Sequence, residues 1–187
     1  MAVNEDLHLA VSLATSLASE VAEFAVPQQQ EDDQNGVGSA VAPPLSPADA
    51  LLADYDRRIT DDDLRAATRS RFFSTHYADA VESGVKALND CVRKRTGLSE
   101  DGDGLMTTAF SANNPKLRIN RGRSKSDESA QRGHMFLCQG VVGAWRNPRA
   151  HTLIDDSPAR ALMMLEAIND LIVVTKAAIR TRKPKKP

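Results

Sequence analysis

The sequence has few aromatic residues, only two cysteines and no long run of apolar side chains. Aromatics make up 4% of the 187 residues, and the hydrophobic share of 41% is mostly alanine, valine and leucine, which favours helices over strands. No stretch approaches the roughly 18 uncharged apolar residues that a membrane span needs. Glu5 and Asp6 stand where an export signal would carry Lys or Arg. We therefore expect a cytoplasmic protein in which Cys91 and Cys138, which lack CxxC spacing, are buried free thiols.

Charge is distributed unevenly along the chain. The formal net charge is −1, but residues 1–60 carry ten Asp or Glu against two Arg, whereas residues 61–187 carry fifteen against twenty-two Lys or Arg. A basic second part favours contact with nucleic acid, although composition alone is weak evidence for it.

Composition and periodicity predict four segments. Residues 4–25 carry one narrow, alanine-rich apolar stripe at helical spacing, which must pack on something to be stable. The stretch after it is rich in Gln, Asp, Gly, Ser and Pro and buries little. The predicted segments are an N-terminal amphipathic helix (1–26), a flexible linker (27–47), a helical domain (48–181) and a basic tail (182–187). The N-terminal helix is free to dock in cis, on a second protomer or on another protein.

Capping and spacing signals predict the helices of the domain. Ser46 before Pro47 suits a helix start, and Thr60-Asp61-Asp62-Asp63 resembles a capping box. Further helices are predicted over 76–96, which Gly97 ends, over the single turn 105–110, over 126–147, which Pro148 ends, and over 158–181 after Ser157. In the helix from 126, the apolar spacing predicts a buried stripe of Ala130, Leu137, Val141, Ala144 and Trp145. No strand pattern competes with these helices.

Residues 116–125, called here the basic segment, concentrate positive charge. They contain Lys116, Arg118, Arg121, Arg123 and Lys125 with only two apolar side chains. The segment is either a solvated loop or a flap that follows a phosphate backbone, because like charges on a short segment destabilise it without a partner.

The strip Arg146-Asn147-Pro148-Arg149-Ala150-His151 carries the candidate chemistry. If Pro148 ends the helix, a tight turn brings Arg146 and His151 to one surface. Histidine exchanges protons near neutral pH, and arginine offers a planar fork of donors to phosphate oxygens. The pair suits RNA cleavage in which His151 removes the proton of a 2′-hydroxyl and Arg146 stabilises the transition state. A second proton donor is needed, which a symmetric dimer would supply.

The strip is also compatible with purely structural roles. An Arg-x4-His spacing is common by chance, and a helix-capping histidine or an arginine that neutralises Asp155 and Asp156 would produce it. His76 is a candidate supporting residue or a helix cap. The acidic loop 98–104 lacks calcium-loop spacing, and His134 with Cys138 offers only two ligands, so we predict no metal site and no cofactor.

The strip and three further stretches resemble the HEPN superfamily, and within it the small bacterial and phage Ymh group. The stretches are Phe73-Ser-Thr-His-Tyr-Ala-Asp-Ala-Val, Gly104-Leu-Met-Thr-Thr-Ala-Phe-Ser and Gly133-His-Met-Phe-Leu-Cys-Gln-Gly. The resemblance covers roughly residues 70–181 and implies an all-α bundle of four or five helices that dimerises with its two strips face to face. Its signature arginine, polar residue and histidine map onto Arg146, Asn147 and His151.

The resemblance implies a metal-independent endoribonuclease, as in defence systems and toxin–antitoxin pairs. Arg149 and the basic segment are then expected to contact RNA. Two rivals remain: a non-catalytic nucleotide- or RNA-binding module, and an antitoxin or scaffold that binds a larger defence protein through the N-terminal helix. The sequence does not separate these three.

Overall fold

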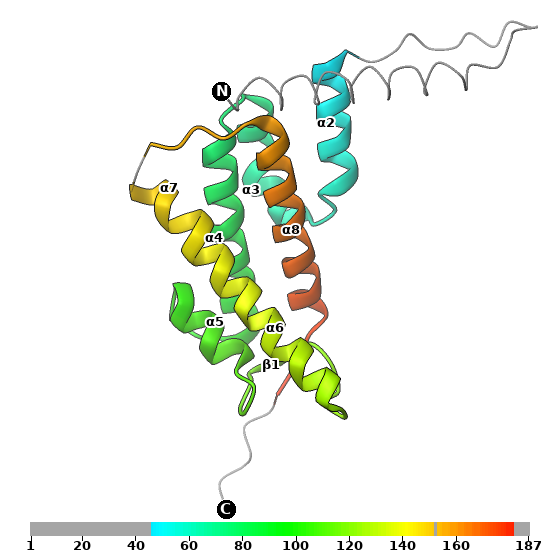
Figure 1. Cartoon of the computed structure of the whole chain (residues 1–187), viewed down its shortest axis with the longest axis vertical. Helices are drawn as coiled ribbons and strands as arrows, with labels where there is room; N and C mark the ends of the chain where they lie inside the picture. Colours follow the sequence, from blue (N-terminus) through cyan, green and yellow to red (C-terminus); the bar gives the residue numbers. More distant parts are fainter. Residues whose placement is uncertain (1–45, 152, 182–187) are drawn as a thin grey trace, which may run out of the picture. The chain divides into compact units, whose positions relative to one another are not determined.

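The computed structural model describes residues 46–151 and 153–181. The expected N-terminal helix, nearly all of the linker and the basic tail lie outside the described residues. The helices are α2 (Pro47–Arg58), α3 (Asp62–Phe73), α4 (Tyr77–Thr96), α5 (Gly102–Phe110), α6 (Lys125–Val141), the π-helical turn η1 (Val142–Arg146), α7 (Asn147–His151) and α8 (Pro158–Ala177) (Figure 1). The predicted all-α class is confirmed, and none of the helices described is long and apolar enough to cross a bilayer.

Local signals set most helix ends. The side chains of Ser46, Asp61 and Ser157 accept hydrogen bonds from backbone amides of the first turns of α2, α3 and α8, which would otherwise lack partners. Gly97 ends α4 in the left-handed conformation, with φ 75°, as its position predicted. The helix starts after Ser46 and Ser157 and the end of α4 are confirmed. The start of α3 lies where it was predicted, but Asp61 caps it and not Thr60 of the predicted capping box.

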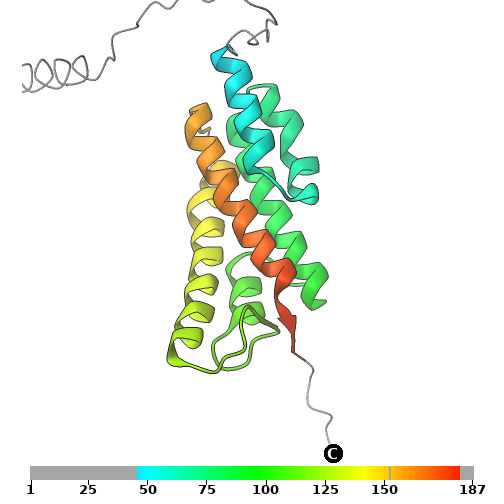
Figure 2. The same cartoon turned by 90° about the vertical axis from the view of Figure 1, so that its right-hand side faces the viewer.

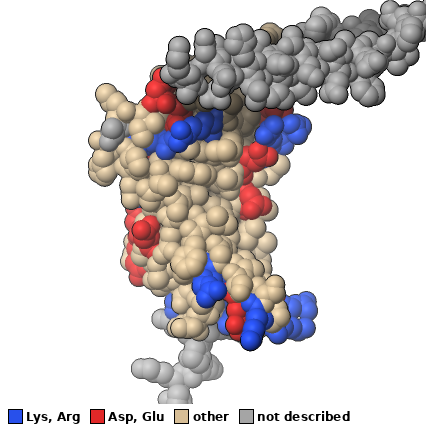
Figure 3. Space-filling model, viewed as in Figure 1, with Lys and Arg blue, Asp and Glu red and all other residues tan. Residues whose placement is uncertain are grey.

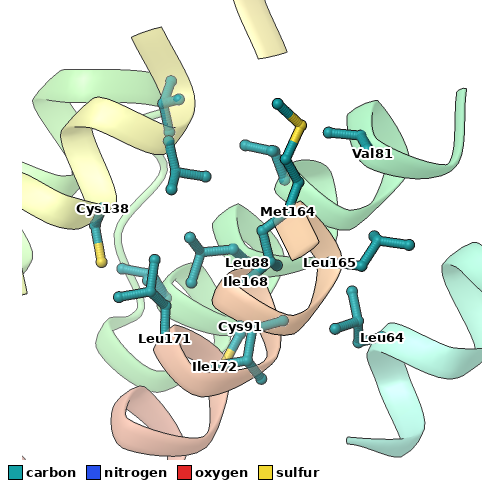
Figure 4. Packing of buried hydrophobic residues seen from close by; sticks show 14 of the residues in the cluster. Leu64, Val81, Leu88, Cys91, Cys138, Met164, Leu165, Ile168, Leu171 and Ile172 are labelled. Atoms are coloured by element: carbon teal, nitrogen blue, oxygen red, sulfur yellow. The ribbon is translucent and has the colours of Figure 1, made fainter. Parts of the chain in front are cut away.

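The core forms where α4 meets α8 and α3. In Figure 2, α8 lies between α6 on one side and α2 and α4 on the other. Figure 4 shows Leu88, Leu165 and Ile168 at the centre of this packing, and all three are fully buried. At Gly84 of α4 an added Cβ would lie 2.9 Å from Leu165 Cδ2, so this glycine permits the close approach of α4 and α8.

A short two-stranded sheet corrects the expectation of no strands. β1 (Leu117–Arg118) pairs antiparallel with β2 (Ile179–Arg180), and Thr181 N–H donates to Lys116 O at 2.9 Å. Two-residue strands are too short to produce a period of two in the sequence. The pairing also ends α8 at Ala177 rather than at the predicted residue 181, and it ties the basic segment to the end of the last helix.

The buried side of α6 differs from the predicted stripe. Gln131, His134, Cys138 and Val141 are buried, whereas Leu137 is 62% exposed, and Ala130 and Ala144 are exposed as well. Trp145 is half-buried. Only Val141 of the predicted stripe is buried, so the stripe was wrong. Polar residues occupy the inner side because they find hydrogen-bond partners there, which apolar periodicity does not reveal.

Gln131 shows how that burial is compensated. Its side-chain amide donates to Phe110 O and Leu117 O, both at 3.0 Å, and accepts from Ile119 N at 3.0 Å. One buried side chain thereby connects α5, β1 and the basic segment to α6, because each of these backbone groups would otherwise lack a partner.

Candidate functional site

The strip lies on a helix that does not end at Pro148. Figure 1 shows α6, η1 and α7 as one continuous helix. In η1 each backbone hydrogen bond spans five residues instead of the four of an α-helix, and Asn147 N–H donates to Val142 O. Proline lacks an N–H and its ring clashes with the carbonyl of the residue four positions before it, so a wider turn just ahead of Pro148 lets the helix continue. The predicted helix end at Pro148 was therefore wrong.

This geometry changes how Arg146 and His151 lie. Five residues apart on a helix, their side chains leave the axis about 140° apart, not on one surface as a tight turn would place them. No hydrogen bond or ion pair joins the two within residues 46–151 and 153–181. Asn147 and His151, four residues apart, share a face of α7.

Arg146 is paired with an acidic residue that precedes α5. Its Nη2 lies 3.1 Å from Asp101 Oδ2, and the two side chains are 25% and 44% exposed. Arg93 reaches the other oxygen of Asp101 at 3.4 Å. The Nε of Arg146 is buried and has no hydrogen-bond partner in the described structure. The guanidinium therefore faces solvent on one edge, with an exposed carboxylate as its counter-ion.

His151 and Asn147 are exposed at the end of this helix. Within the described part of the chain, neither side chain makes a hydrogen bond or an ion pair. His151 therefore caps no helix, and the first of the structural roles considered for the strip does not apply to it.

Arg149 fills the second structural role, the neutralisation of the acidic pair before α8. Its side chain is 4% exposed, and Nε and Nη2 donate to Oδ2 of Asp156, itself 2% exposed, at 2.8 and 2.5 Å. Its Nη1 donates to Trp145 O at 2.7 Å. The neutralising arginine is thus Arg149, through Asp156, and not Arg146. A buried guanidinium does not fit the expected contact of Arg149 with an RNA backbone.

The basic segment is held in a defined conformation. Asn120 donates to Asp127 O at 2.8 Å and accepts from Gly122 N at 3.0 Å, and Arg123 N donates to Asp127 Oδ2 at 2.8 Å. Gly122 takes a φ of 62°, which glycine adopts readily. Arg121, Arg123 and Lys125 are exposed, while Lys116 and Arg118 are half-buried. The segment therefore presents its charges on an ordered loop rather than on a loose one.

Among the described residues, neither His76 nor His134 makes a hydrogen bond to the strip. His76 stands at the N-cap position of α4, but its exposed side chain makes no capping hydrogen bond. His134 packs edge-on against Phe110 with ring centroids 4.7 Å apart, and burial lowers its pKa. Cys138 lies 3.6 Å from it, and burial raises the pKa of that thiol to about 12. No group of three or more His, Cys, Asp or Glu in the described ranges is placed to hold a metal ion.

Two features of the site had no signal in the sequence. Asp101 is far from Arg146 along the chain, and local patterns predict no pairing between them. The π turn depends on hydrogen bonding around a proline that sequence rules treat as a helix end.

The described residues define an all-α domain with a polar strip at the end of a long, π-distorted helix. The chain belongs to the family described as protein of unknown function (Hypoth_ymh), whose model matches residues 58–173, more than half of the chain. The match supports the Ymh part of the resemblance. No curated protein and no solved structure matches the chain significantly.

Proposed function

We propose that this protein is a metal-independent endoribonuclease of the HEPN type that acts as a homodimer. The observation that carries the proposal is that His151 is exposed and has no hydrogen-bond or ion-pair partner in the described structure. It lies on the same continuous helix as Arg146. The neighbouring Arg149 makes the structural ion pair, so that pair does not account for Arg146 and His151. An accessible histidine on the same helix as an arginine suits proton transfer at a phosphate.

The proposed reaction needs only protein groups. His151 takes the proton of a ribose 2′-hydroxyl, the 2′-oxygen attacks phosphorus, and the bond from phosphorus to the 5′-oxygen breaks. The departing oxygen takes a proton, so the products are a 2′,3′-cyclic phosphate and a 5′-hydroxyl. Arg146 stabilises the charge on the crowded phosphate, and Asn147 supports the strip.

A second copy of the chain would provide the second proton donor that one chain lacks. One strip contains a single histidine, and a partner's His151 would supply the proton for the leaving group. The exposed charges of the basic segment and the tail beyond Arg180 would hold the RNA backbone. The cellular role that fits such an enzyme is an effector in a toxin–antitoxin pair or an antiviral defence system.

The test of this proposal is cleavage of RNA in the presence of EDTA. We expect the full chain to cut single-stranded RNA and to leave 2′,3′-cyclic phosphate ends, identified by end-group analysis of the products. The matched control is the same sequence with 2′-O-methyl riboses, in which the attacking hydroxyl is blocked. Cutting of the methylated strand at a comparable rate would exclude attack by the 2′-oxygen.

Replacing Asp101 with asparagine is expected to strengthen RNA binding. The carboxylate competes with phosphate for Arg146, and its removal releases an exposed ion pair, so affinity should rise about twofold to fivefold. Fluorescence anisotropy with labelled RNA measures the change. Asp103→Asn is the matched control. It removes the same charge two residues along the chain from Asp101, and the side chain of Asp103 makes no ion pair in the described structure. Equal effects of the two variants would show a general charge effect and no competition at Arg146.

A non-catalytic RNA-binding module is the second candidate. It is favoured by the separation of Arg146 and His151 around the helix, together with the ordered basic segment. Under this alternative the chain binds RNA, dimerises or regulates a larger defence complex, and leaves RNA intact in the EDTA assay.

A further inference from the structure

One side of the described domain is apolar and exposed. The α6–α8 face consists of Gly133, Phe136, Leu137, Gly140 and Ala144 of the long helix with Met163, Ala167 and Asp170 of α8. Phe136, Leu137 and Met163 are 56%, 62% and 54% exposed, values unusual for large apolar side chains gathered on one face. Figure 3 shows the middle of this view almost free of charged side chains, with Lys and Arg near its upper and lower ends.

Gly133 and Gly140 of this face have no packing role among the described residues. A Cβ added at Gly133 or Gly140 would meet nothing within 4 Å, unlike at Gly84, where it would press on Leu165. Glycine is a poor helix former, and two of them on this side of α6 weaken the helix without improving its packing among the described residues. The absence of side chains at these positions lets another backbone approach this face closely.

We propose that the α6–α8 face is the surface through which a second copy of this chain binds. A symmetric interface uses the same patch twice, so the patch must carry both protrusions and a hollow. This one does: Phe136 and Leu137 protrude beside a groove of about 370 Å³ that continues along Gly140, Ala144, Trp145, Ala167 and Leu171.

The face is large enough for the apolar centre of a dimer interface. From Gly133 to Ala144 the long helix spans roughly 18 Å, and two packed helices are roughly 20 Å wide, which makes roughly 360 Å² in projection. The relief of the side chains and the polar rim around the face add to this, toward the roughly 800 Å² that each partner buries in a stable complex. Asp170 is the only charged residue that lines the groove among those described, as expected for an interface core with charges at its rim.

The position of the strip favours a second copy over other occupants. α6 passes without a break into η1 and α7, so a copy whose long helix runs parallel to this one brings a second Arg146 and His151 toward the first. This step rests on the proposed function, in which one chain lacks a second proton donor. The shape, the glycines and the apolar surface support the dimer independently of catalysis.

Sedimentation velocity of the full chain over a range of concentrations tests the interface. We expect the wild type to sediment at twice the 20.3 kDa of one chain. Gly140→Arg and Leu137→Arg should each raise the dimer dissociation constant at least about tenfold, because each places a charge in the interface core. Gly104→Arg is the matched control, since Gly104 of α5 is also exposed and also has open space for a Cβ. Circular dichroism checks that every variant keeps its helices.

Three results would overturn the inference. One is a wild-type chain that stays monomeric at high concentration, whether or not it cuts RNA. Another is a dimer that persists in both Gly140→Arg and Leu137→Arg. The third is a dimer that dissociates equally when Leu17 and Val21 of the full chain are replaced by aspartate, which would assign the contact to the N-terminal segment. A dimer that depends on Gly140 but cuts no RNA supports this interface and contradicts the proposed nuclease.

Discussion

His151→Ala is expected to abolish RNA cleavage while the chain stays folded. The exposed imidazole makes no hydrogen bond or ion pair within the described structure, so its loss should leave the free energy of unfolding nearly unchanged. Loss of a general acid or base lowers rates by about 10²- to 10⁴-fold, and a dimer loses both copies at once. Cleavage of a labelled RNA in EDTA measures the rate, and chemical denaturation measures the stability.

The matched control for this experiment is His76→Ala. His76 is also exposed and also makes no side-chain hydrogen bond at its helix end, but it lies outside the strip. It should keep cleavage close to the wild-type rate. Equal cleavage by wild type and His151→Ala would contradict the catalytic role, and RNA binding without cleavage in both would favour the binding module.

Arg149→Ala is expected to destabilise the domain by about 3–5 kcal/mol, since it leaves the nearly buried Asp156 without its partner. It also removes the donor to Trp145 O in η1. Urea denaturation followed by circular dichroism measures the loss. The effect should far exceed that of any exposed ion pair in the described domain.

Arg160→Ala is the control for Arg149. Its side chain is 64% exposed and lies 3.7 Å from the same Asp156, so its removal should change stability by less than about 1 kcal/mol. If Arg149→Ala instead kept wild-type stability and lost RNA affinity, the result would assign Arg149 to the RNA-binding surface, as the sequence analysis predicted.

The helix starts of this domain and the end of α4 were largely predictable because their causes are local. Ser46, Asp61 and Ser157 lie within three residues of the amides that they cap, and Gly97 ends α4 by its own backbone conformation. The Arg-x4-His spacing was likewise readable as a candidate site. Signals that act over one helical turn are present in the sequence before any tertiary contact forms.

The buried side of α6 and the pairing of the arginines were not predictable in this way. Gln131 is buried because it meets carbonyls of α5 and β1, and Leu137 is exposed because no described element covers it. Arg146 pairs with Asp101 and Arg149 with Asp156, whereas the sequence left open which residue neutralises the acidic pair before α8. These choices depend on which segments, distant along the chain, come to lie beside the helix.

The strip shows both kinds of information together. From the residues alone came the identity of Arg146, Asn147 and His151 and the chemistry that they can perform. Folding of the whole domain decided that Pro148 continues the helix through a π turn, which separates Arg146 from His151 around the axis and leaves His151 exposed. The physical reason is that a helix continues past a proline when the packing of the surrounding helices compensates for the lost hydrogen bond, and that packing is a property of the tertiary structure.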